Sequence, residues 1–366
     1  MQTIKLGKQK IGENEPCFII AEAGVNHVLE HDDLKKIGAK SALEVAFRMV
    51  DAAAEAKADA IKFQSFDTGK VQFRATKKPA YQVNNVGSDE EINYFDMIKK
   101  LETSKDDQIK IADYCKKKSI TFLSTPYDSE SANFLDKEIN VPMFKLASIE
   151  ANNHLFLRHV ARKSKPFILS TGLSSIEDVR SVVKIARKEG FAGRMILMQC
   201  TSDYPTKPKD VNLNVIKSYI KEFSDILIGF SDHTTDYIAS IGAVAIGAVA
   251  VEKHFTLDKK FKGPDHCSSL DKNDLIEWIK AVRKIESSMG SYEKKITNAE
   301  KRNETMRKYI VITPQKSGTI IKESMLIPMR TGEGILPIDK NLEKIVGKRL
   351  KINVREITPL TWEMIR

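Results

Sequence analysis

The chain of 366 residues has few cysteines, and their spacing excludes two common classes of small, cross-linked domain. Its four cysteines, Cys17, Cys115, Cys200 and Cys267, form no CxxC pair. Disulfide scaffolds and zinc knuckles place cysteines at short, regular spacings, so neither is expected here. A reduced, cytoplasmic protein is predicted.

The sequence also lacks an apolar run long enough to cross a membrane. The longest such stretch, 238–251, is interrupted by Ser240, Gly242 and Gly247, and it is shorter than the ~20 residues that a membrane span needs. Residues 1–15 contain no apolar core, so we expect no export signal there.

A one-sided distribution of charge is missing as well. The net charge is +10, with 59 Lys and Arg against 49 Asp and Glu, but the two signs alternate in stretches such as KIARKEG and KAVRKIES. That mixture is typical of solvated helix faces. Aromatic residues make up 7% of the chain, and no basic, aromatic-rich platform for nucleic acid is seen. The positive surplus favours an anionic small substrate instead.

What the sequence does contain is eight short apolar runs, each ending in a polar or charged residue and each separated from the next by a helical stretch. Buried parallel strands show this pattern. Eight such βα units predict an α/β protein with a (β/α)8 TIM barrel, whose active site lies at the C-terminal ends of its strands. The predicted strands are 16–23, 60–66, 121–125, 143–147, 166–170, 194–200, 226–231 and 248–254.

The chain exceeds the ~250 residues of a single barrel, so a second domain is expected. The predicted boundaries are a barrel domain at 1–288, a polar linker at 289–306 and a small β-rich domain at 307–366. Residues 1–15 are expected to form a hairpin that plugs the bottom of the barrel. The long connection 67–102 is predicted to be a lid, since connections of this length tend to be functional.

Two histidines end neighbouring strands. His233 follows strand seven and His254 ends strand eight. Adjacent strands lie ~4.8 Å apart, so both imidazoles could reach one divalent ion. With two nitrogen ligands, water and substrate oxygens must complete the shell, which favours Mn²⁺ or Mg²⁺ over structural zinc. The alternative is that each histidine is a hydrogen-bonded structural residue.

Lysines and hydroxyls occupy other strand ends. Lys62 and Gln64 share one face of strand two, and Lys145 lies in strand four. A lysine on an inner strand is costly to bury unless an anion neutralises it. The lysines predict a pocket for phosphate and carboxylate groups, together with Thr125, Ser148, Ser170 and Ser231. Two alternatives stay open: a lysine that extends outward between helices, and a Schiff-base aldolase that uses Lys62 or Lys145.

Carboxylates complete the candidate site. Glu22 and Glu150 stand at the ends of strands one and four, where either could act as a general acid or base. Asp265 could contact a metal-bound water or the substrate, or could only form the turn beside Gly-Pro. Tyr204 is either a sugar contact or a loop aromatic packed on Pro205. His27 either lines the site or caps its loop.

With these residues in place, the chain resembles the sialic acid synthases, a family that includes N-acetylneuraminate, legionaminate and pseudaminate synthases. The tail, with MRTGEGI and PLTWEMI, resembles the family's C-terminal antifreeze-like (SAF) domain. The matching stretches of the barrel are IIAEAGVNH, AIKFQS, FLSTPYD, FKLASIEANN, ILSTGLSS, QCTSDYPT, IGFSDHT, VEKHFTLD and GPDHCSSL.

The resemblance implies a metal-dependent condensation of phosphoenolpyruvate with an N-acylated hexosamine, either N-acetylmannosamine or a 2,4-diacetamido-6-deoxy relative. It implies that His233 and His254 hold the ion, and that Ser202 lies near the phosphate. It further implies a homodimer in which each tail domain covers the partner's barrel mouth and Arg330 reaches the sugar there. By the same resemblance, phosphoenolpyruvate is bound by Lys62, Thr125, Lys145, Ser148, Ser170 and Ser231, and the sugar or water is oriented by Glu22, Gln64, Glu150, Tyr204 and Asp265.

Three features depart from the family pattern: some members have asparagine in place of Ser202, 83–93 does not align, and 28–42 is longer than in many members. They leave the reaction type unchanged but the sugar open, with EKHFTLD and GPDH favouring the legionaminate branch. Two other functions remain alternatives. One is a 3-deoxy-sugar-acid synthase, which needs further basic residues for a sugar phosphate. The other is a carbohydrate-binding or ice-binding protein, which leaves the polar barrel mouth unexplained.

Overall fold

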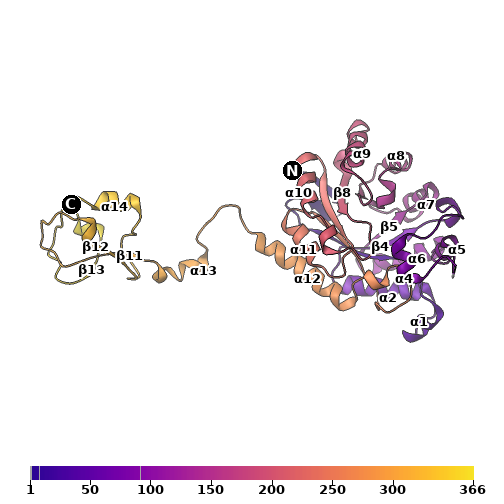
Figure 1. Cartoon of the computed structure of the whole chain (residues 1–366), viewed down its shortest axis with the longest axis horizontal. Helices are drawn as coiled ribbons and strands as arrows, with labels where there is room; N and C mark the ends of the chain where they lie inside the picture. The colour runs from indigo at the N-terminus through magenta and orange to yellow at the C-terminus, as the bar shows by residue number, and fades with distance from the viewer. Residues whose placement is uncertain (1, 8, 91) are drawn as a thin grey trace. The chain divides into compact units, whose positions relative to one another are not determined.

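The computed structural model describes residues 2–7, 9–90 and 92–366. Contacts within the chain divide it into two compact units, one ending at Gly290 and the other running from Ser291 to Arg366. Figure 1 shows the barrel in the first unit and the small sheet of the second.

The first unit is a (β/α)8 barrel, which confirms the predicted fold. Its eight strands form parallel ladders in the order β5-β4-β3-β10-β9-β8-β7-β6, and β5 and β6 lie side by side. The strands are β3 (Phe18–Gly24), β4 (Ala60–Ser65), β5 (Thr121–Pro126), β6 (Phe144–Leu146), β7 (Phe167–Ser170), β8 (Met195–Cys200), β9 (Leu227–Asp232) and β10 (Ala250–His254).

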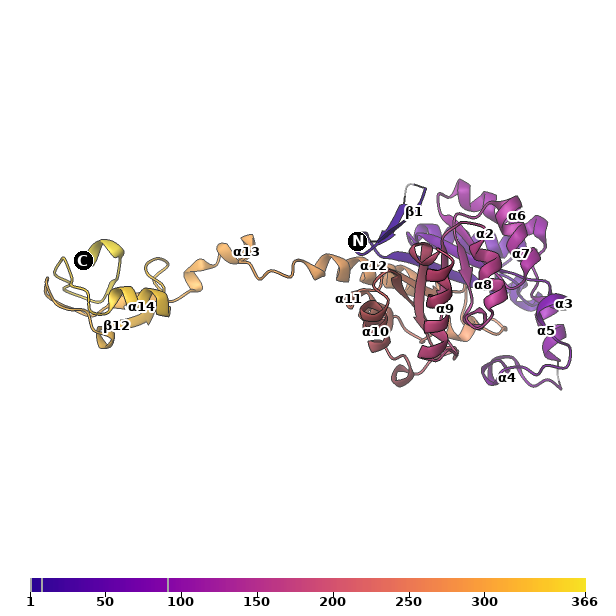
Figure 2. The same cartoon turned by 90° about the horizontal axis from the view of Figure 1, so that it is seen from above.

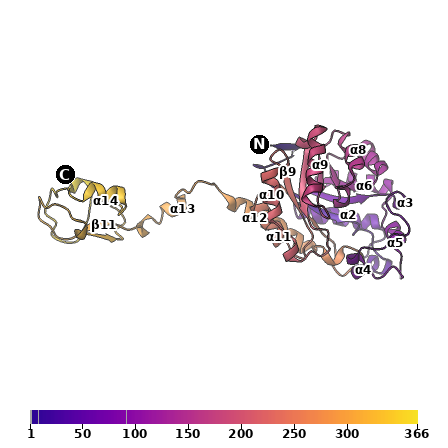
Figure 3. The same ribbon diagram turned by 45° about the horizontal axis from the view of Figure 1, so that its top comes forward.

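Helices surround the strands, as Figure 3 shows. Several begin at a serine whose side chain accepts a hydrogen bond from the first turn, including Ser104 and Ser175. The helices that follow successive strands are α2 (Ala42–Glu55), α6 (Lys105–Lys117), α7 (Ser129–Phe134) with a π turn to Ile139, α8 (His154–Ala161), α9 (Ile176–Lys188), α10 (Asn214–Glu222), α11 (Ile238–Ala245) and α12 (Lys272–Met289).

The inner face of the barrel changes from apolar to polar along each strand. Near the strand starts, Ile20, Leu123 and Ile196 pack into one buried cluster. The antiparallel hairpin of β1 (Thr3–Leu6) and β2 (Gln9–Gly12) adds Ile4 and Ile11 to the same cluster, so it closes this end of the barrel as predicted. Only the other end of the barrel is left for a site.

The connection 67–102 is more ordered than the sequence predicts. It contains three short helices, α3 (Thr68–Val71), α4 (Ala80–Val86) and α5 (Tyr94–Lys100), which Figure 2 shows on one side of the barrel. A further short helix, α1 (His31–Lys36), lies in the long segment 28–42 and was not predicted. Each is shorter than three turns, so apolar periodicity alone gives little signal.

The second unit is rich in β-structure, with a small antiparallel sheet in the order β12-β11-β13. Its elements are β11 (Tyr309–Ile312), β12 (Leu326–Met329), β13 (Thr358–Pro359) and the helix α14 (Asp339–Ile345). Before them lie two short turns, α13 (Asn298–Lys301) and a 3₁₀ turn at Glu304–Met306. Ile310, Ile312 and Leu350 form its own buried core. Among the described helices of both units, none has the length and apolarity required to cross a membrane.

Candidate active site

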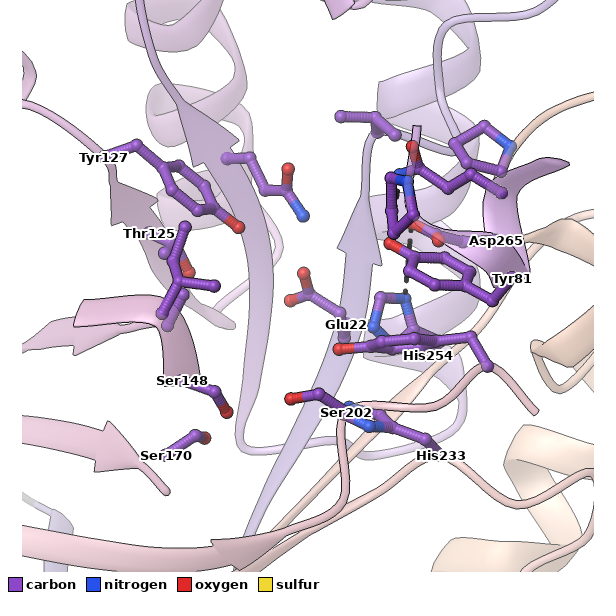
Figure 4. A pocket seen from close by; sticks show the side chains of 18 of the residues that line it. Glu22, Tyr81, Thr125, Tyr127, Ser148, Ser170, Ser202, His233, His254 and Asp265 are labelled. Atoms are coloured by element: carbon purple, nitrogen blue, oxygen red, sulfur yellow. Dashed lines mark hydrogen bonds and ion pairs between the residues drawn. The ribbon is translucent and has the colours of Figure 1, made fainter. Parts of the chain in front are cut away.

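A cavity of about 470 Å³ lies at the C-terminal ends of the barrel strands (Figure 4). The barrel walls and the loops after its strands supply the polar lining. All but two of the predicted site residues line it, namely Glu22, Lys62, Gln64, Thr125, Lys145, Ser148, Ser170, Ser202, Tyr204, Ser231, His233, His254 and Asp265.

Two buried ammonium groups meet at the base of this cavity. Lys62 Nζ lies 2.6 Å from Glu22 Oε2 and donates a hydrogen bond of 3.0 Å to Thr125 Oγ1. Lys145 Nζ donates to Glu252 Oε1 at 3.1 Å, and Lys62 Nζ lies 3.8 Å from Glu252 Oε2. Both lysines therefore turn into the barrel, and the outward orientation is excluded for them.

Glu252 is a site residue that the sequence reasoning missed. It stands two residues before His254 on β10 and so faces the same way, which is a signal that could have revealed it. Burial alone would raise its pKa, but Lys145 and Lys62 lower the pKa to about 2, so the carboxylate is ionised. In the free protein Glu252 pairs with Lys145 and lies near Lys62, so its single charge offsets one of the two positive charges. An anionic ligand would bind the same two ammonium groups.

A row of serine hydroxyls borders the lysines. Ser148 Oγ accepts a hydrogen bond of 3.0 Å from the Gly172 amide, and Ser170 Oγ is buried with no partner among the described residues. A Cβ atom at Gly172 would lie 2.1 Å from Ser202 Oγ, so glycine is needed for the hydroxyls to come this close. The unpartnered hydroxyl of Ser170, near two ammonium groups, fits a ligand that carries phosphate or carboxylate oxygens.

The rings of the two predicted metal ligands lie close together in the wall of the cavity. The ring centroids of His233 and His254 are 5.6 Å apart. His233 Nδ1 lies 2.7 Å from the Thr201 carbonyl oxygen, which only accepts, so Nδ1 carries a proton. The other ring nitrogen, Nε2, lies 3.4 Å from Ser231 Oγ. Metal-binding histidines commonly show this arrangement.

His254 provides the complementary feature. Its Nδ1 is buried without a hydrogen-bond partner in the described part of the chain and lies 4.0 Å from Asp265 Oδ2. Burial, with smaller contributions from His233 and Lys62, lowers the pKa of His254 well below its usual value, so its ring is neutral. Across residues 2–7, 9–90 and 92–366 no group of three His, Cys, Asp or Glu could hold a metal. Two imidazoles alone would leave the other positions around a cation to water or substrate oxygens.

Two carboxyl groups of the cavity titrate close to neutrality. Burial raises the pKa of Glu22 to about 7, although Lys62 acts in the opposite direction. Burial likewise raises the pKa of Asp265 to about 6. A group with a pKa close to the working pH can both accept and give up a proton, so either residue suits general acid-base chemistry.

Aromatic rings form one wall. The ring of Tyr204 lies 4.0 Å from that of His233 and 5.7 Å from that of His254, measured between centroids. Burial raises the Tyr204 pKa well above its usual value, so the phenol is neutral. Tyr81, Tyr94 and Tyr127 also line the cavity and were not predicted. Tyr81 and Tyr94 belong to the connection 67–102.

Three other candidate residues are not part of this lining. Glu150 is buried but does not line the cavity, and its Oε2 accepts a hydrogen bond of 2.8 Å from Asn153. Arg330 follows β12 in the second unit, whose position relative to the barrel is not described. His27 is buried and does not line the cavity, so of its two predicted roles the structure excludes a place in the site lining. Its Nε2 lies 2.8 Å from Thr103 Oγ1, and its ring packs edge-on against Phe63.

His27 leads to a pH-dependence test of stability. Burial lowers its pKa from 6.5 to about 4, with Asp107 acting weakly in the opposite direction. Between these values the folded protein binds fewer protons than the unfolded chain, so the free energy of unfolding falls as the pH drops. The raised pKa values of Glu22 and Asp265 oppose this effect, so variants must be compared with one another.

From pH 7 to pH 5, we expect His27 alone to reduce the free energy of unfolding by about 2 kcal/mol. Over that interval the free energy of unfolding of His27→Gln, measured by urea titration, should therefore fall by about 2 kcal/mol less than that of the wild-type protein. His31→Gln, at an exposed position, should behave as the wild type. An unaltered pH dependence in His27→Gln would contradict the buried, neutral state of the imidazole.

A family model described as the NeuB family matches residues 49–294 of the chain. The N,N'-diacetyllegionaminic acid synthase of Legionella pneumophila is 35% identical over 97% of this chain and 96% of its own length. The human N-acetylneuraminate-9-phosphate synthase is 35% identical over 97% of this chain and 94% of its own.

A solved structure gives the same result. The N-acetylneuraminic acid synthetase of Leptospira borgpetersenii, in complex with citrate, superposes with a TM-score of 0.69 at 32% identity, covering 82% of this chain and 95% of that one. The family model spans most of the barrel, and the two relatives extend over nearly the whole chain. The chain therefore belongs to the NeuB family.

Proposed function

We propose that the chain is a sialic-acid-type synthase that condenses phosphoenolpyruvate with an N-acylated hexosamine. Carbon 3 of phosphoenolpyruvate bonds to the aldehyde carbon of the open-chain sugar, water adds at carbon 2, and the carbon-2 to phosphate-oxygen bond breaks. The products are a nine-carbon 2-keto acid and inorganic phosphate. The relatives named as legionaminic acid and N-acetylneuraminate-9-phosphate synthases support this reaction type.

The observation that carries the proposal is the convergence of Lys62 and Lys145 on Glu252 in a cavity that also contains the unpartnered hydroxyl of Ser170. Phosphoenolpyruvate presents a carboxylate and a phosphate on a small frame, and two fixed ammonium groups with serine donors match both. When it binds, its oxygens replace those of Glu252 as partners of the lysines. Holding both substrates in line supplies effective molarities of ~10⁵ M or more.

The other residues take roles that follow from their positions. Glu22 and Asp265 hold or release protons near neutral pH at the cavity wall. Gln64 and Tyr204 orient the sugar beside the imidazoles. His233 and His254 would hold Mn²⁺ or Mg²⁺, which when bound supplies Lewis-acid polarisation of a carbonyl oxygen.

A Schiff-base aldolase is a weaker candidate. Burial and the neighbouring Lys62 lower the pKa of Lys145, as a nucleophilic amine requires, but the ion pair with Glu252 at 3.1 Å favours the charged form of the amine. Borohydride with a keto acid should therefore leave both lysines unmodified, and a trapped lysine would favour the aldolase.

The test of the reaction measures phosphate release from phosphoenolpyruvate with and without Mn²⁺. The acceptors offered are N-acetylmannosamine, its 6-phosphate and a 2,4-diacetamido-6-deoxyhexose. Release that requires both sugar and metal is expected with at least one acceptor. Release with none of them, from folded protein, would refute the assignment.

We also propose that the second unit acts as an SAF domain in a homodimer, covering the partner's cavity with Arg330 at the sugar. The unit is basic, with twelve Lys and Arg against six Asp and Glu in 307–366, and Arg330 is exposed. Arg330→Ala should raise the KM of the sugar about tenfold or more, because one charge-assisted hydrogen bond is lost. The KM of phosphoenolpyruvate should stay unchanged. The matched control is Arg355→Ala, exposed in the same unit. Equal effects on both KM values would contradict this role.

A further inference from the structure

The connection 67–102 contains a buried lysine that takes no part in the site described above. Lys78 is only 6% exposed. Its Nζ donates to the carbonyl oxygens of Gly87 at 3.2 Å, Ser88 at 2.8 Å and Ile92 at 2.5 Å. An ammonium group has three N–H donors, so all of them are used.

These partners are backbone oxygens rather than side-chain carboxylates. The nearby Asp89 carboxylate instead accepts a hydrogen bond from the backbone amide of Lys78. Burying a charge is costly unless it is fully hydrogen-bonded. Backbone carbonyl oxygens therefore surround the Lys78 ammonium group as they would surround a small bound cation.

The carbonyl groups that surround Lys78 separate two parts of the connection that both line the cavity. Before them come Pro79–Gln82, which directly follow the lysine, and after them come Tyr94, Ile98 and Leu101 on and after α5. Fixing Gly87, Ser88 and Ile92 to one ammonium group sets how α4 and α5 lie relative to each other. Both parts of the cavity wall depend on that arrangement.

The same connection reaches the imidazole pair. The ring of Tyr81 lies 4.8 Å from Tyr204, which packs on His233. Asn85 Nδ2 donates to the Pro264 carbonyl oxygen at 2.7 Å, next to Asp265. Figure 4 shows Tyr81 on the same side of the cavity as His254 and Asp265.

We infer that Lys78 is a positioning residue whose ammonium group serves as a built-in cation, holding residues 79–90 and 92–101 against the sugar side of the cavity. It acts through Tyr81 and Asn85, and it does not touch the lysine base where phosphoenolpyruvate is proposed to bind. Its kinetic consequence rests on the proposed function.

The test compares Lys78→Met, which keeps the apolar stem, with Lys77→Met at the exposed neighbouring position. Lys78→Met should raise the KM of the sugar at least about tenfold, because charge-assisted hydrogen bonds are the strong ones, and change that of phosphoenolpyruvate less than twofold. Amide exchange in 79–101 should speed up about tenfold or more, since the opening of this segment becomes easier. Lys77→Met should match the wild type in both measurements. Equal rises of both KM values, or unchanged exchange, would overturn the inference.

A chemical rescue isolates the ammonium group itself. In Lys78→Ala, added propylammonium should restore amide protection in 79–101 and lower the sugar KM, whereas tetramethylammonium, which has no N–H donor, should not. Rescue by both ions or by neither would contradict the inference. If the wild-type protein turns over none of the acceptors, the proposed function fails, but the exchange and rescue measurements still decide the role of Lys78.

Discussion

Replacing His233 by alanine is expected to lower metal-dependent turnover by about 10³-fold or more. A Lewis acid contributes several kcal/mol to the stabilisation of developing charge, and each 1.36 kcal/mol is a factor of ten in rate. The Thr201 hydrogen bond occupies His233 Nδ1, so Nε2 is the nitrogen that would bind the metal, and the alanine variant would lose one of two imidazole ligands. Phosphate release measures the turnover, and calorimetric titration with Mn²⁺ measures the metal affinity.

The matched control is His27→Gln, which changes another buried histidine outside the cavity. It should keep the metal affinity and the turnover within about twofold of the wild type. A His233→Ala protein that binds Mn²⁺ as the wild type does would show that His233 is not a ligand.

The Lys145→Met variant is expected to raise the KM of phosphoenolpyruvate about 10- to 100-fold, since a hydrogen bond to a charged group contributes about 1.5–3 kcal/mol. The same change leaves Glu252 buried, with Lys62 at 3.8 Å as its remaining lysine partner. A loss of about 3–5 kcal/mol in the free energy of unfolding should accompany it. Steady-state kinetics and urea unfolding measure the two effects.

The Lys253→Met variant distinguishes the effect of Lys145→Met on phosphoenolpyruvate binding from its effect on stability. Lys253 is as deeply buried as Lys145 and lies 3.2 Å from Asp232, but it does not line the cavity, although it follows Glu252 on β10. We expect a comparable loss of stability with the KM of phosphoenolpyruvate unchanged. If both variants raise this KM equally, the effect arises from strand β10 or from the fold, and the proposal that Lys62 and Lys145 bind phosphoenolpyruvate is wrong.

The barrel could be predicted from the sequence because each strand repeats one physical pattern. Apolar residues such as Ile20 and Leu123 fill the closed end, and polar residues follow them on the same inner face. Lys62 and Gln64, two residues apart on β4, illustrate this alternation. The same rule located most of the cavity lining, whereas the roles of its residues stay predictions.

What the sequence did not predict arises from short elements and tertiary contacts. The helices α3, α4 and α5 are each under three turns, so they depend on packing and on buried contacts such as those of Lys78. Glu150 was predicted at the end of a strand, but β6 ends at Leu146 and Glu150 lies beyond it in the turn Ser148–Glu150, where its carboxylate accepts a hydrogen bond from Asn153. A turn of this kind reorients side chains in a way that strand alternation does not describe.

The most direct test of the account is anomalous diffraction from crystals grown with Mn²⁺ and phosphoenolpyruvate. The account predicts one manganese peak shared by His233 and His254, with the phosphate and carboxylate of phosphoenolpyruvate on Lys62 and Lys145. Manganese bound to other residues, or phosphoenolpyruvate away from both lysines, would contradict it.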